Sequence, residues 1–133
     1  KIFRKVNLIM SKKTKGQIEA EISELIMKFE KEYIGRGPQN IKTYIIEDNI
    51  LIKEKGVLTL AEQQLAKEET GVKLIKELRV KLIENSREIL STLIKDITNL
   101  DVLAVHSDIS TENGERIIVF SLEENLERNI MSK

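Results

Sequence analysis

The chain has 133 residues, enough for one domain and too few for two independent hydrophobic cores. Hydrophobic residues make up 41% and charged residues 33%, a composition that excludes wholesale disorder. The 22 basic and 22 acidic residues cancel, which argues against nucleic-acid binding, because phosphate contacts need a basic excess. No apolar run approaches the roughly 18 to 20 residues that span a bilayer. With no cysteine and one histidine, we expect neither a metal nor a cofactor.

The N-terminal leader is strongly basic and carries no acidic residue before residue 16. Apolar residues at positions 2, 3, 6 and 9 could share one face of a short helix that binds an anionic membrane. The alternative, which we favour, is that residues 1–9 are non-native sequence or a misassigned start, because Met10 begins an ordinary start sequence. We therefore place residues 1–13 outside the domain as a basic leader, expected to be flexible or non-native.

The sequence predicts one helix followed by a hairpin in the first half of the domain. Apolar residues recur every three or four positions from Thr14 to Ile34, which predicts an amphipathic helix. The segment Gly35–Pro38 ends that helix, because glycine permits left-handed backbone and proline blocks helical continuation. Two β-rich runs follow at 41–47 and 50–58, and Asp48–Asn49 is expected to form the turn between them.

The second half repeats this order with longer helical sequence. Thr59 and Glu62 match a capping box that starts a helix, and residues 69–71 are expected to bend or break it. The apolar stripe from 72 to 97 then predicts a helix of about 40 Å at about 1.5 Å per residue. Such a helix is longer than a small domain is wide, so part of it should pack on a partner chain.

The C-terminal segment of the chain is predicted to form a second hairpin followed by a tail. Residues 102–107 and 115–122 alternate between polar and apolar, and Asn113–Gly114 is a strong hairpin signal. Residues 123–133 are predicted to be a polar tail that frays. The order α-β-β-α-β-β predicts a single α+β domain over 14–122, a two-layer sandwich with a four-stranded antiparallel sheet and the helices on one face. Because a lone hairpin is marginal, we also expect a homodimer.

Three short motifs resemble the MpsC family of bacterial domains. They are Gly35-Arg36-Gly37-Pro38 after the first helix, Gly56-Val57-Leu58-Thr59 followed by Ala61-Glu62, and Ser107-Asp108. The similarity runs from about residue 14 to residue 122. The resemblance implies a component of a Na⁺-translocating, membrane-potential-generating system, with a link to inorganic-carbon supply. It transfers no catalytic residue to this chain.

The loop Gly35, Arg36 and Gly37 is the first candidate site. Glycines let backbone amides approach a ligand, and an arginine fork can bind bicarbonate, phosphate or a carboxylate. The competing interpretation, which we favour, is structural: the same segment is what a sharp helix stop requires.

The second candidate site is His106 with Asp108. Alternate residues of a strand share a face, so this pair could form a pH-sensitive hydrogen bond, whereas Ser107 points to the opposite face, which argues against a nucleophilic triad. An enzyme or anion sensor would require Arg36 to converge with both residues in one pocket.

The function that the sequence favours is that of a non-enzymatic accessory or regulatory protein, acting through protein–protein contacts. The expected partners are a second copy and a membrane ion-translocating subunit, and the expected location is cytoplasmic, at the inner face of the membrane. The alternative is a bicarbonate or phosphate sensor or enzyme that uses the Gly35–Pro38 loop.

Overall fold

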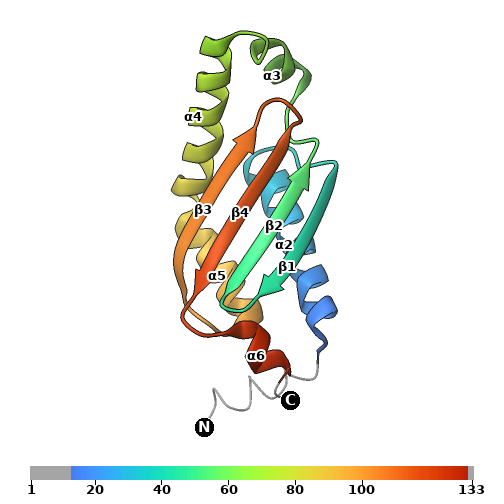
Figure 1. The fold of residues 1–133 in the computed structure, drawn as a ribbon, viewed down its shortest axis with the longest axis vertical. Coiled ribbons are helices and arrows are strands. Elements are labelled where there is room, and N and C mark those ends of the chain that lie inside the picture. The colour runs from blue at the N-terminus through green and yellow to red at the C-terminus, as the bar shows by residue number, and fades with distance from the viewer. Residues whose placement is uncertain (1–12, 132–133) are drawn as a thin grey trace.

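The computed structural model describes residues 13–131, so the predictions about residues 1–12 lie outside the described residues. The helices are α2 (Lys15–Tyr33), α3 (Leu60–Leu65), α4 (Glu69–Asn85), α5 (Arg87–Thr98) and α6 (Leu126–Met131), and the strands are β1 (Asn40–Ile46), β2 (Asn49–Lys55), β3 (Val102–Ser110) and β4 (Glu115–Leu122). All four strands pair antiparallel in the order β1-β2-β4-β3. Figure 1 shows α2, α4 and α5 on one side of this sheet. The predicted α+β two-layer fold is confirmed.

The main core lies between the sheet and these helices. In β4, residues 116, 118, 120 and 122 are buried while their neighbours are partly exposed, as expected for a sheet covered on one face. The helix side is rich in isoleucine: Ile22, Ile26, Ile50, Ile52, Ile94 and Ile118 are all fully buried. Each such side chain stabilises the fold by roughly 1.5–3 kcal/mol.

The first helix is where the sequence predicts it. Thr14 is its N-cap, and the Thr14 hydroxyl accepts from the amide of Gln17 while the Gln17 side chain accepts from the Thr14 amide. The second predicted capping box is also present, since the Thr59 hydroxyl accepts from the Glu62 amide and the Glu62 carboxylate accepts from the Thr59 amide. Local sequence therefore determines where both helices begin.

Both hairpins form, but their turns differ from the prediction. The first turn is Glu47–Asp48, one residue before the predicted Asp48–Asn49, and Glu47 adopts a positive φ of 56°. The amide of Glu47 donates to the Glu127 carboxylate, and its carbonyl accepts from the Glu127 amide. This long-range support explains a turn that local sequence does not favour. In the second hairpin β3 continues to Ser110, three residues past the predicted end, before Gly114 completes the turn.

The predicted 40 Å helix over 72–97 is wrong. Two helices, α4 and α5, meet at Ser86, whose ψ of 7° interrupts the helical hydrogen bonding. Asparagine and serine at positions 85 and 86 favour such a break because their side chains compete for backbone groups. The break lets α5 cover the main core through Leu90 and Ile94, while α4 runs beside β3 and extends past the end of the sheet (Figure 1).

The C-terminal tail is not a frayed polar segment over its described part. Residues 126–131 form α6, and Leu126 is 4% exposed within the main core. The Lys15 ammonium also reaches the Glu127 carboxylate at 2.6 Å, which ties α6 to the start of α2. Leu126, the partly buried Ile130 and the contacts of Glu127 thus hold this segment against the domain.

Side chains cover backbone groups on both edge strands of the sheet. On β1, the amide of Ile45 donates to the Glu19 carboxylate at 2.8 Å. On β3, the Arg87 guanidinium donates to the carbonyl of Leu103 at 3.1 Å. Edge strands protected in this way are poor templates for pairing with another strand.

Candidate functional site

The Gly35–Pro38 loop forms the end of α2. Gly35 has a φ of 94°, in the left-handed region that favours glycine, and its amide donates to the carbonyl of Glu30 at 3.0 Å. The half-buried Arg36 donates from Nη2 to the carbonyl of Gly56 at 3.3 Å, which joins the loop to the end of β2. Gly37 packs so closely on Met27 that an added Cβ would lie 2.5 Å from its sulfur. These contacts give the loop a structural role, and its anion site stays a prediction.

We expect Arg36→Ala to destabilise the fold by about 0.5–1.5 kcal/mol, since it removes one hydrogen bond to a backbone carbonyl. Urea unfolding measures this loss. A thermal-shift series with bicarbonate and phosphate tests the anion site separately: it requires stabilisation of the wild type by the anion and none of Arg36→Ala. An equal response of both proteins would remove the anion site.

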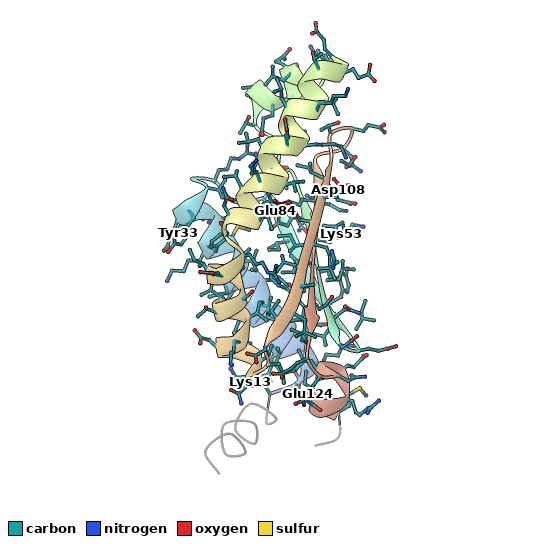
Figure 2. The ribbon with its side chains drawn as sticks, turned by 90° about the vertical axis from the view of Figure 1, so that its left-hand side faces the viewer. Lys13, Tyr33, Lys53, Glu84, Asp108 and Glu124 are labelled. Atoms are coloured by element: carbon teal, nitrogen blue, oxygen red, sulfur yellow. The ribbon has the colours of Figure 1, made fainter. Side chains whose placement is uncertain are left out.

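His106 and Asp108 share the open face of the sheet, as the alternation predicts. His106 lies opposite Val119 and Asp108 opposite Ile117, and both residues are exposed. Figure 2 labels Asp108 on β3, toward the turn that joins β3 to β4. The Asp108 carboxylate accepts from its neighbour's amide, Ile109, at 2.8 Å and from the Lys76 ammonium at 3.3 Å. The Ile109 amide and then Lys76 hold the pKa of Asp108 below its usual value.

Arg36 does not converge with this pair within the described structure. Its guanidinium lies at the end of β2, whereas His106 is on β3, the edge strand on the other side of β4. His106 instead borders a hollow of about 470 Å³ beside the junction of α4 and α5, where Glu84 and Arg87 contribute the charged groups. The sensor or enzyme that would combine these residues therefore lacks its common pocket.

The most unusual group in the described structure is a buried charge cluster that joins α2, β2 and β4. Arg116 is 1% exposed and lies directly opposite Glu54, which is 0% exposed, on the neighbouring strand. Arg116 Nε donates to Glu54 Oε1 at 2.7 Å, and its Nη2 donates to Glu30 Oε1 on α2. Glu30 is 1% exposed, so one guanidinium bridges two carboxyl groups that water does not reach.

This cluster leaves polar atoms without a partner. Glu30 Oε2, Glu54 Oε2 and Arg116 Nη1 are buried and make no hydrogen bond with the described residues. Burial raises the pKa of Glu30 to about 9; the neighbouring Glu54 carboxyl acts in the same direction, while Arg116 and Arg79 oppose them. The neutral form of Glu30 is therefore favoured at neutral pH.

A second buried ion pair lies beside the first. Arg79 on α4 donates from Nε and Nη2 to the two carboxylate oxygens of Glu62 on α3, at 2.9 and 2.5 Å, and also to the carbonyl of Val57. Burial alone would raise the pKa of Glu62, but hydrogen bonds from Arg79 and the Thr59 amide outweigh it, so the pKa lies below its usual value. This pair is balanced in charge, unlike the cluster around Arg116.

The sequence predictions missed both groups, although the sequence contains a signal for the first. Arg116 falls in the alternating phase of Ile118 and Phe120, and Glu54 in the phase of Ile52. Glu30 continues the apolar stripe of α2, four residues after Ile26. Charges of opposite sign in the buried phase of three elements indicate a buried ion cluster.

Residues 13–131 contain neither a cluster of metal ligands nor a membrane-spanning helix. No group of three or more histidine, cysteine, aspartate or glutamate side chains in this range is placed to hold a metal ion. No helix in the same range is long and apolar enough to cross a bilayer.

Comparison with known proteins gives the chain its family. Residues 14–124 match the family model described as "Na+-translocating membrane potential-generating system (MpsC)". The chain is 43% identical over 119 residues to the uncharacterized protein YbcI of Bacillus subtilis (strain 168), which covers 90% of this chain and 96% of YbcI. It is 26% identical over 109 residues to the uncharacterized protein YrhF of the same organism, covering 80% of this chain and 88% of YrhF. No solved structure matches it. The family model covers most of the chain and YbcI matches over nearly its whole length, so the chain belongs to the MpsC family.

Proposed function

We propose that this protein is a non-enzymatic accessory or regulatory subunit of a Na⁺-translocating, membrane-potential-generating system, and that it works as a homodimer through protein contacts at the inner face of the membrane. The family match supplies the system, since MpsC is described as part of it. The single observation on this chain that supports a contact role is a surface of exposed leucines on α4.

This α4 surface consists of Leu74 and Leu78, which are 60% and 54% exposed and lie one helical turn apart. Leu65 at the end of α3 is 50% exposed, and its carbonyl packs against Gly71, three residues before Leu74. Isolated exposed leucines need no explanation, but leucines on successive turns of one helix favour a helical partner.

A second copy fits the α4 surface better than an added strand does. The exposed leucines are flanked by Lys73, Glu77, Lys81 and Glu84, so two antiparallel copies of α4 can place opposite charges side by side. The edge strands are less suited to pairing with a strand of a second copy, because Glu19 and Arg87 already bond to backbone groups of β1 and β3. Helix-to-helix contact is therefore the mode of association that we expect.

We expect the double substitution Leu74→Glu with Leu78→Glu to convert the dimer to a monomer, because four buried carboxylates would oppose each other across the symmetric contact. Sedimentation velocity at micromolar concentration measures this change. Leu103→Glu is the matched control, since Leu103 is 61% exposed at the bulge of β3 and lies outside the α4 surface. A wild-type protein that sediments as a monomer would contradict the dimer.

The accessory role is tested in the native host. Deletion of the gene should lower the Na⁺-dependent membrane potential, and affinity capture of the tagged protein should recover an ion-translocating membrane subunit. Wild-type protein should restore the potential and the Leu74→Glu, Leu78→Glu variant should not. An unchanged potential after deletion, together with no captured subunit, would remove this function.

A further inference from the structure

We propose that Glu30 and Glu54 form a buried proton-binding site, in which the two carboxyl groups hold one proton between them at neutral pH while Arg116 bridges them. This inference goes beyond the accessory function and does not depend on it. It starts from the charge count of the buried groups.

The count covers every charged side chain that faces Glu30. These are Glu54 from β2, Arg116 from β4, and Arg79 from α4, which is itself paired with Glu62 from α3. The residues of β1 and β3 on the helix side of the sheet are uncharged, and so are the buried residues of α5. Fully ionised, the group holds three carboxylates against two guanidiniums and leaves one uncompensated negative charge.

An uncompensated charge is costly at this place. Glu30, Glu54 and Arg116 are each at most 1% exposed, and the Arg79–Glu62 pair is at most 9% exposed. Removing a lone charge from water costs several kcal/mol, so a buried carboxyl normally binds a proton instead. One proton makes the whole group neutral.

The hydrogen-bond pattern indicates which oxygens take the proton. Arg116 satisfies Oε1 of both glutamates, which leaves Oε2 of each without a donor among the described residues. A proton on one carboxyl converts it from an acceptor into a donor for the other. Burial and the neighbouring Glu54 raise the pKa of Glu30 to about 9, in agreement with this arrangement.

Loss of the proton should loosen one end of the fold. Glu30 lies in the last turn of α2, immediately before the Gly35–Pro38 loop, whereas Glu54 and Arg116 belong to the sheet. Deprotonation therefore places the excess charge between α2 and the sheet and weakens that contact. Proton binding at this site should therefore strengthen the packing of α2 against the sheet.

The sign of the pH dependence follows from linkage. Because the pKa of Glu30 is about 9 in the folded protein and 4.5 ordinarily, the folded state binds more protons between these values. The stabilisation is fully present below the ordinary pKa and is lost as pH rises toward the folded one. Glu62, Asp108 and Glu127 have lowered pKa values, so their contributions are lost only in acid.

The test compares the wild type with Glu30→Gln. The glutamine amide can accept from Arg116 through its oxygen and donate to Glu54 through its N–H, and it binds no additional proton. In urea unfolding between about pH 5 and about pH 8.5, the folding equilibrium constant of the wild type should fall relative to Glu30→Gln by up to about tenfold per pH unit. Glu21→Gln on the same helix is the control, since the Glu21 side chain is 40% exposed and pairs with Lys13, and it should keep the wild-type slope.

Infrared spectroscopy of the folded protein reads the proton directly. A protonated-carboxyl band should be present in the wild type and Glu21→Gln at neutral pH, and absent from Glu30→Gln. It should also be absent from Glu54→Gln, because Glu30 then balances Arg116 alone. The wild-type spectrum decides the matter even where a variant fails to fold. No such band at neutral pH, or parallel pH slopes for wild type and Glu30→Gln, would overturn the proposal.

Discussion

Replacing Arg116 with methionine should destabilise the protein more than any other single change at a buried charge. The substitution leaves the buried carboxyl groups of Glu30 and Glu54 without their shared donor. Removing one partner of a buried ion pair typically costs about 3–5 kcal/mol. Small domains are stable by only about 5–15 kcal/mol, so we expect Arg116→Met to be marginally folded or unfolded in urea titrations monitored by circular dichroism.

Two comparisons make this expectation specific. Lys95→Ala breaks the exposed ion pair between Lys95 and Asp101 and should leave the unfolding midpoint nearly unchanged. The triple variant Glu30→Met, Glu54→Met, Arg116→Met removes the charges together and should recover much of the lost stability, because well-packed hydrophobic residues of similar size often replace buried ions well. An Arg116→Met variant as stable as the wild type would contradict the cluster.

Gly71→Ala should be the second large effect, although glycine-to-alanine changes within helices usually stabilise. An added Cβ at Gly71 would overlap the carbonyl oxygen of Leu65 and lie 2.6 Å from its carbonyl carbon. Both atoms are backbone, so relief requires α3 to move from α4 and disturbs the Arg79–Glu62 pair that joins these helices. We expect a loss of about 1–3 kcal/mol or more in urea unfolding.

Gly16→Ala is the matched control for this clash. Gly16 is also in the first turn of a helix, but the nearest atom to its added Cβ is the Thr14 hydroxyl oxygen at 4.0 Å. Without a clash, the alanine should stabilise α2 by up to about 1 kcal/mol through helix propensity. Equal effects of the two substitutions would show that α3 does not press on Gly71 in solution.

Local sequence predicted the elements whose causes are local. The stripe ending at Phe29 and the caps Thr14 and Thr59 determine helix positions through contacts within a few residues. Strand alternation predicted that His106 and Asp108 share a face, and the register bears this out. The fold class followed because two helix–hairpin units leave few ways to cover one sheet face.

Predictions were wrong where distant contacts decide the local structure. Asn85 and Ser86 weaken the helix locally, but the break at Ser86 also depends on distant contacts, since α5 packs on the core and α4 follows β3. Glu47 takes the turn position because Glu127, 80 residues away, bonds to its amide. The spacing of apolar residues predicts a helix, but it does not predict which of the helical turns pack on the core and which pack on another element.

The candidate site also has features that the sequence predicts and features that only the tertiary structure determines. From the sequence alone came the family motifs, the Gly35–Pro38 helix stop and the absence of thiol or multi-histidine chemistry. Only the tertiary structure brought Arg116 to Glu54, 62 residues earlier, and to Glu30, 86 residues earlier. It also decided that the three share one unbalanced charge, because a carboxyl group's protonation depends on burial and on neighbours that chain order does not specify.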